Sequence, residues 1–178
     1  MLTEPLPTTL DVRKAAAREV TVSGTVALEK LPRLQTLLAS DEGHIEAECR
    51  FERDEENRFI AEVNIRAELY VRCQRCLERL ALQLESSNRL AIVSDDELAR
   101  QLPASLDPWV VDSETGDLWA LVEDDLILEV PAVAYHDTEA CRRLLDDYRQ
   151  PPSDIERDGD NPFKVLERLK TGSTEQEN

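Results

Sequence analysis

The residues best suited to chemistry are two cysteines, Cys73 and Cys76, which are separated by two residues. At this spacing both thiol groups can face one point, so the pair could bind a metal ion or form a disulfide. Two further residues of metal-binding types, His136 and Cys141, follow about 60 residues later. Three sulfurs and one nitrogen form an ordinary tetrahedral set for structural zinc, which makes these four residues the candidate zinc ligands. The alternative is that the thiols stay free and the Cys73–Cys76 segment only shapes a tight hairpin.

A thiol oxidoreductase is the redox alternative for the same cysteine pair. Thioredoxin-like proteins place such a pair at the N-terminus of a helix, because the helix dipole lowers the pKa of the thiol. Here the pair follows a long alternating segment and precedes a second strand-like segment, residues 80–84. The setting therefore disfavours redox chemistry.

Other enzyme classes find no support in the sequence. It contains no GxGxxG, Walker, GxSxG or HExxH motif, and its two histidines are His44 and His136. The acidic run 123–125 is explained by the charged face of an amphipathic helix. We expect no catalytic residues and no small-molecule substrate.

The net charge of −17 is unevenly distributed along the chain. Residues 1–90 carry a net charge of −3 and residues 91–178 a net charge of −14. The second half should therefore repel a phosphate backbone and attract basic proteins. Four arginines near the cysteine pair provide a hypothetical contact with RNA or a partner; they are Arg66, Arg72, Arg75 and Arg79. The alternative is a solvated strand face on which these arginines pair with Glu62, Glu68 and Glu78.

The sequence also predicts a compartment. No apolar run approaches the ~20 residues of a membrane span, and the first 14 residues lack the pattern of a signal peptide. We expect a cytoplasmic protein, in which the four cysteines do not form structural disulfides.

Alternation with a period of two is the clearest pattern in the chain. Apolar residues alternate with charged ones over 45–52 and again over 59–71, which predicts antiparallel strands with one buried face. Cys49 falls on the buried side, so we interpret it as a core residue and not as a ligand. The second strand leads into the cysteine pair, and residues 90–93 extend the returning strand after an expected kink near 86–88.

Helical spacing predicts several helices beside this sheet. The strongest is 117–130, where Leu118, Val122 and Leu126 share an apolar face and Pro131 ends the helix. Its acidic residues are expected on the opposite face, with Asp125 near the edge. Shorter helices are predicted around 12–17, after Pro32 and after residue 95, and short strands at 20–26 and 109–111.

Together these elements predict an α+β fold: a largely antiparallel, meandering β-sheet with a packed amphipathic helix. The expected organisation is a single domain over 1–149, an acidic proline-containing linker over 150–161, a short C-terminal helix over 162–170 and a disordered tail over 171–178.

Taken in order, several segments resemble the YceD family, the large ribosomal RNA subunit accumulation proteins. The segments are 7–11, 73–77, 117–131, 136–139 and 161–166, which include a CxRC element, an LVED-to-proline element and an NPF-x-VL element. Some relatives have a fuller cysteine set after the position of Pro131, whereas this chain has His136 and Cys141 there, with Ala140 at a neighbouring ligand position.

The resemblance implies a non-enzymatic ribosome-biogenesis factor that supports synthesis, processing or stability of the large-subunit 23S rRNA. Its partners would be that rRNA or its precursor particle, and a basic ribosomal protein or assembly factor. Asn161 and Phe163 of the NPF element join the hypothetical contact residues. The structural alternative is a zinc-stapled protein-interaction module that does not contact RNA.

Overall fold

The structure, a computed structural model, describes residues 4–149. The expected acidic linker, C-terminal helix and tail, with Asn161 and Phe163, lie outside the described residues.

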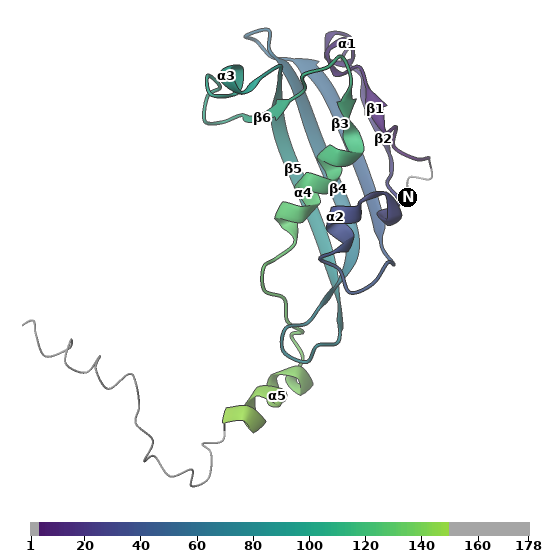
Figure 1. The fold of residues 1–178 in the computed structure, drawn as a ribbon, viewed down its shortest axis with the longest axis vertical. Coiled ribbons are helices and arrows are strands. Elements are labelled where there is room, and N and C mark those ends of the chain that lie inside the picture. The colour runs from purple at the N-terminus through teal and green to yellow at the C-terminus, as the bar shows by residue number, and fades with distance from the viewer. Residues whose placement is uncertain (1–3, 150–178) are drawn as a thin grey trace, which may run out of the picture.

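A five-stranded sheet with the order β2-β3-β4-β5-β6 forms the body of the fold (Figure 1). Neighbouring strands from β2 to β5 are antiparallel, whereas β6 is parallel to β5. The content of helices and mainly antiparallel strands confirms the predicted α+β class. The strands are β2 (Thr21–Thr25), β3 (His44–Arg53), β4 (Phe59–Arg72), β5 (Arg79–Val93) and β6 (Asp107–Val110); a small second sheet pairs β1 (Thr9–Leu10) with β7 (Gly116–Asp117).

The helices are short, apart from two near the C-terminal end of the described residues. As predicted, the helix α4 (Leu118–Glu129) packs against β5 and is followed by Pro131, but it is not amphipathic, because its apolar and acidic residues are spread around the helix. The helix α5 (Glu139–Arg149) was not predicted, and it places Cys141 in its first turn. The others are α1 (Val12–Ala17), the 3₁₀ helix η1 (Leu28–Lys30), α2 (Pro32–Gln35) and α3 (Asp96–Ala99).

The hydrophobic core fills the space between one face of the sheet and helices α1, α2 and α4. Phe51 from β3, Val63 from β4 and Leu126 from α4 all lie in it with no more than 1% of their surface exposed. Cys49 is also fully buried there, which confirms that it is a core residue. Burial raises the pKa of the Cys49 thiol to about 12, so this thiol is chemically inert.

Two acidic side chains of α4 are buried, which contradicts the expectation that its carboxylates lie on the solvent face. Glu123 is 5% exposed and accepts hydrogen bonds from the backbone N–H groups of Arg33 and Leu34 at the start of α2. Asp125 is 8% exposed and accepts hydrogen bonds from Ser86 and Asn88 of β5. These carboxylates satisfy polar groups of other segments, so they link α4 to α2 and to the sheet.

Strand β5 runs through residues 86–88 without the expected interruption. Its register with β4 continues from the pair Arg72–Arg79 to the pair Ile60–Ala91. The hydrogen bonds from Ser86 and Asn88 to α4 use the polar side chains that had predicted a kink. The β4–β5 hairpin is therefore one long, unbroken arm, whose inner face contributes Val63 and Leu84 to the core and whose turn lies near α5 (Figure 1).

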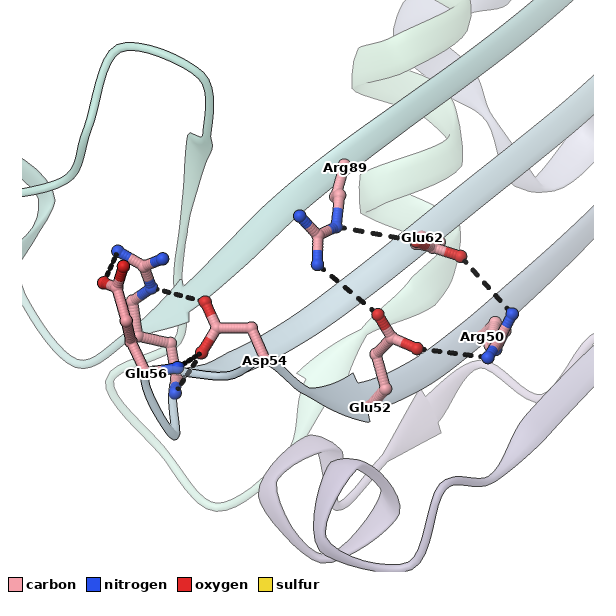
Figure 2. A network of polar contacts seen from close by, with 7 residues as sticks. Arg50, Glu52, Asp54, Glu56, Glu62 and Arg89 are labelled. Carbon is pink, nitrogen blue, oxygen red and sulfur yellow. Dashed lines mark hydrogen bonds and ion pairs between the residues drawn. The ribbon is translucent and has the colours of Figure 1, made fainter.

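The other face of the sheet is covered with charge. Figure 2 shows a closed ring of ion pairs on β3, β4 and β5, in which Arg50 and Arg89 each contact both Glu52 and Glu62. The nitrogen–oxygen distances range from 3.2 to 3.9 Å. Exposed ion pairs contribute little stability one by one, but opposite charges on neighbouring strands favour this register over a shifted one.

In the described part of the chain, no helix has the length and apolar character needed to cross a membrane.

Candidate metal centre

The cysteine pair lies in a tight turn at the far end of the β4–β5 hairpin. Arg72 and Arg79 are the last paired residues, and the turn between them is closed by a hydrogen bond from the N–H of Cys73 to the carbonyl of Glu78. The N–H of Leu77 donates to the carbonyl of Cys73 at 2.9 Å. Leu77 has a positive φ of 63°, which lets the turn fold both cysteine side chains toward one side.

The segment after α4 is fixed to this turn by two hydrogen bonds from Gln74. Its backbone N–H donates to the carbonyl of Ala134 at 2.9 Å, and its side-chain amide donates to the carbonyl of Ala132 at 2.8 Å. These contacts place His136 beside the turn, and α5 then begins three residues later. Residues 60 positions apart in sequence are thereby brought to one point.

The four candidate ligands meet as the sequence predicted. Their side-chain ligand atoms all lie within 4.8 Å of one another, in the group Cys73, Cys76, His136 and Cys141. The sulfurs of Cys73 and Cys141 are 3.6 Å apart, and the sulfur of Cys76 is 3.2 Å from Nδ1 of His136. Cys73 and Cys141 are buried, whereas Cys76 and His136 are half-buried.

The orientation of His136 suits a metal ligand. Its Nε2 lies 3.0 Å from the carbonyl oxygen of Arg79. Because a carbonyl oxygen can only accept, Nε2 carries the proton and Nδ1 keeps its lone pair facing the sulfur atoms. A hydrogen bond from the second nitrogen to a backbone carbonyl is the usual support of a metal-binding histidine.

The thiol groups influence one another. Burial alone raises the pKa of Cys73, but backbone N–H groups, including those of Cys76 and His136, outweigh it and lower that pKa to about 5. The pKa of Cys76 is raised, because burial and the thiols of Cys73 and Cys141 outweigh the backbone N–H of Glu78 that lowers it. The thiolate of Cys73 therefore forms more readily than that of Cys76.

The distances fit a tetrahedral metal ion. Zinc–sulfur bonds of about 2.3 Å place two sulfur ligands roughly 3.8 Å apart in an ideal tetrahedron. The observed separation of 3.6 Å between Cys73 and Cys141 is close to that value and much longer than a disulfide bond. The donor set of three sulfurs and one imidazole could therefore hold a metal ion without large rearrangement.

Arg75, between the two cysteines of the pair, lies against the centre. Its guanidinium group stacks 4.6 Å from the ring centroid of Tyr135 and approaches the sulfur of Cys141 to 3.9 Å. Its Nε atom is buried without a hydrogen-bond partner among the described residues. The stacking on Tyr135 was missed in the sequence, because nothing in the spacing relates positions 75 and 135.

The arginines named as contact candidates separate into two groups. Arg72, Arg75 and Arg79 lie at the hairpin tip, whereas Arg66 lies six residues before Arg72 along β4, about 20 Å away. The alternative interpretation had these arginines paired with Glu62, Glu68 and Glu78. Instead, Arg66 contacts Glu85, and Arg79 contacts Glu42 and the ring of Tyr70. Arg72 is exposed, and no carboxylate among the described side chains, residues 4–144, pairs with it.

The surroundings of the pair also bear on the redox alternative. The cysteines follow β4 and precede β5, as predicted, and no helix of the described residues begins at the pair. The lowered pKa of Cys73 comes from backbone hydrogen bonds within the turn and from the segment that carries His136. The same donors would also stabilise thiolates that bind a metal, so the arrangement could hold a metal ion.

Comparison with known proteins gives the same family as the sequence motifs. The model of the family described as "Large ribosomal RNA subunit accumulation protein YceD" matches residues 61–170. The curated large ribosomal RNA subunit accumulation protein YceD of Haemophilus influenzae is 29% identical over 169 residues, which cover 93% of this chain and 96% of that protein. No solved structure matches the chain significantly. Since the family model matches more than half of the 178 residues, the chain belongs to the YceD family.

Proposed function

We propose that this protein is a cytoplasmic, non-enzymatic ribosome-biogenesis factor that supports accumulation of the large-subunit 23S rRNA. The family membership supports the general role, and one observation supports the way it is carried out. Four metal-ligand atoms from segments 60 residues apart lie within 4.8 Å of one another at the tip of the β4–β5 arm. A rigid, basic tip at the end of an otherwise acidic protein is suited to a restricted contact with RNA.

The metal would be zinc, held by Cys73, Cys76, His136 and Cys141. Zinc favours tetrahedral sets of thiolate and imidazole ligands, and a closed four-ligand site serves a structural purpose. Bound zinc supplies a cross-link that needs no oxidising compartment. The protein's own residues do the positioning: Gln74 holds the segment after α4, and the carbonyl of Arg79 orients the imidazole.

The contact surface would be formed by Arg72, Arg75 and Arg79. Arginine side chains bind phosphate oxygens and stack on bases, and here Tyr70 and Tyr135 stack beside them. Asn161 and Phe163 remain predicted members of this surface. The limited size of the basic region is consistent with a protein of charge −17 that binds one site on the particle and does not coat RNA.

A deletion strain complemented with variants tests this proposal. The native chain should restore the ratio of 23S to 16S rRNA, and Arg72→Glu should fail to restore it while keeping its zinc. Arg66→Glu is the matched control, since it makes the same change on the same strand away from the tip. Equal rRNA ratios for the two variants would contradict the proposed contact, and unchanged rRNA in the deletion strain would contradict the function itself.

Two further experiments in the complemented strain distinguish direct RNA contact from the structural alternative. A zinc-stapled module that only binds protein would keep all its partners after ribonuclease treatment of a salt-washed lysate. A direct contact through Arg72 predicts instead that rRNA crosslinks to the native chain and that Arg72→Glu abolishes the crosslink. Zinc content measured in both proteins shows whether the centre itself survived the substitution.

A further inference from the structure

Strand β5 has an open edge. It spans 15 residues, but β6 pairs only with residues 90–93 at its C-terminal end. On the side away from β4, none of the described strands is adjacent to residues 81–87. The edge lies on the long β4–β5 hairpin, between the part of β5 that pairs with β6 and the turn that carries the cysteine pair (Figure 1).

The hydrogen bonds at the two ends of β5 show which residues face this edge. In an antiparallel strand the N–H and C=O of one residue point to the same side, and successive residues alternate. The carbonyl of Glu78 accepts from the β4 side, whereas the carbonyl of Arg79 contacts His136 on the other side. At the far end the carbonyl of Val93 accepts from Val111 beside β6. Odd-numbered residues therefore face outward throughout, since the β4–β5 register is unbroken.

The outward backbone groups are unpaired. Among the backbone groups of residues 4–149 and the side chains of residues 4–144, the outward N–H and C=O groups of Ala81, Gln83, Glu85 and Ser87 have no hydrogen-bond partner. Proteins usually protect such an edge with proline, lysine or a β-bulge, because it can pair with another strand. Residues 81–87 contain none of these.

The charge around the edge is negative on both faces of the sheet. On the outer face, Glu85 borders a hollow of about 710 Å³, which is also lined by Glu46, Glu48 and a single cation, Arg66. On the inner face, Glu129 of α4 is exposed one turn beyond the buried Asp125. A strand added here would place its alternate side chains among carboxylates on either face.

We propose that residues 81–87 of β5 bind an extended segment of a protein partner, rich in Lys and Arg, as an additional strand of the sheet. Backbone hydrogen bonds would supply affinity, and the flanking carboxylates would select basic side chains. A second copy of the chain fits less well, because each copy carries a charge of −17. Residues 150–160 of the same chain fit less well too, with four acidic residues and one basic residue. This surface is distinct from the metal centre, so the inference does not rest on the proposed function.

Hydrogen exchange of the full-length protein, followed by NMR, tests the proposal residue by residue. The probe is a synthetic ten-residue peptide of alternating Lys and Val, and the control peptide alternates Glu and Val. In the free protein the amides of Gln83 and Glu85 should exchange fast, and those of Leu82 and Leu84 slowly. The Lys–Val peptide should slow the first pair at least ~10-fold, and the control peptide should leave it unchanged.

Two results would overturn the proposal. One is a bound Lys–Val peptide that leaves exchange at Gln83 and Glu85 unchanged. The other is slow exchange at these amides in the free protein, since the edge would then already be covered. Dilution of the free protein then shows what covers the edge. Protection that is lost at low protein concentration comes from a second copy of the chain. Protection that remains after dilution comes from the chain's own terminal residues.

Charge reversal tests the selection of basic side chains. Glu85→Lys should weaken binding of the Lys–Val peptide about 10-fold, because it removes a carboxylate beside the edge and adds a repelling ammonium group. Glu55→Lys is the matched control, with the same change of charge in the turn between β3 and β4. Equal weakening by both variants would show general charge attraction without pairing at the edge, and would reject the site.

Discussion

The Nε2 atom of His136 lies 3.0 Å from the carbonyl oxygen of Arg79 at the start of β5. This contact fixes the tautomer of the imidazole, turns Nδ1 toward the three thiols and ties the segment after α4 to the sheet. One backbone carbonyl thus connects the register of the long hairpin to the geometry of the candidate metal centre.

Loss of one sulfur ligand should remove the metal. Cys141→Ser is expected to reduce bound zinc from about one equivalent to a small fraction, because the weaker hydroxyl ligand leaves a three-ligand site. Cys49→Ala is the control, since Cys49 is buried in the core and outside the ligand group. Elemental analysis of protein purified without chelator measures both, and equal zinc contents would disprove the ligand assignment.

Removal of the metal should release α5 selectively. Cys141 ties α5 to the hairpin through the sulfur of Cys73 and the guanidinium group of Arg75. Chelation should therefore accelerate hydrogen exchange in Glu139–Arg149 by ~10-fold or more, because it removes a cross-link between this helix and the hairpin. Exchange in α4, which packs on the core, should not change; a parallel increase there would indicate general unfolding.

The buried carboxylate of Glu123 should matter more than its exposed neighbour. Glu123→Ala leaves the backbone N–H groups of Arg33 and Leu34 without their acceptor, which should cost about 2–3 kcal/mol of unfolding free energy. Asp124→Ala removes a second ion pair of Arg33, but this carboxylate is 60% exposed, so the expected cost is below ~1 kcal/mol. Urea denaturation of both variants makes the comparison.

The pH dependence of stability should have opposite signs at two carboxylates. Burial raises the pKa of Asp125 above 3.8, and the hydrogen bonds from Ser86 and Asn88 offset only part of it. Its favourable contribution is present below pH 3.8 and is lost as pH rises through the raised folded pKa. Burial also raises the pKa of Asp54, but the hydrogen bonds from Arg58 outweigh this effect and lower the pKa of Asp54 below 3.8. The stabilising contribution of Asp54 is therefore lost as the pH falls.

Two variants measure how the contributions of Asp125 and Asp54 to stability change with pH. The stability of the native chain relative to Asp125→Asn should decrease from pH 3.8 toward neutrality, whereas its stability relative to Asp54→Asn should increase with rising pH around and below 3.8. Urea unfolding at a series of pH values provides the data. If both differences in unfolding free energy changed with pH in the same direction, either the burial assigned to Asp125 or the pairing assigned to Asp54 would be wrong.

A methyl group at position 24 should detach the first described residues from the sheet. A Cβ on Gly24 would lie 2.4 Å from the backbone nitrogen of Leu6 and 2.7 Å from the carbonyl of Glu4. Gly24→Ala should therefore lose the burial of Leu6, which is 1% exposed, at a cost of about 2–4 kcal/mol. Ser23→Ala, at an exposed neighbouring position, should change stability by less than ~0.5 kcal/mol.

The sequence was sufficient to predict the features that depend on local pattern. Alternation predicted β3 and β4 and the burial of Cys49, and helical spacing predicted α4 and the position of its end. The cysteine and histidine types also predicted that these four side chains lie together, although His136 and Cys141 are distant in sequence from the pair.

The features that were missed depend on contacts between distant segments. The burial of Glu123 follows from the position of α2, whose N–H groups need an acceptor, and no helical pattern within α4 contains that information. Helix α5 is a different case, because its few apolar residues recur at helical spacing; the sequence did carry a signal for this helix, which its many charged residues obscured. The pairing of β6 with β5 joins segments that share no local signal.

The unbroken alternation of β5 also limits how its length can change. Removing one residue between Arg79 and Val93 would exchange inner and outer side chains for part of the strand. It would also turn one of two carbonyl groups toward β4: that of Arg79, which orients His136, or that of Val93, which accepts a hydrogen bond from Val111 beside β6. Removing two residues, together with the two that face them on β4, would keep both orientations and shorten the arm by about 7 Å. The distance from the core to the hairpin tip can therefore change only in steps of two residues per strand.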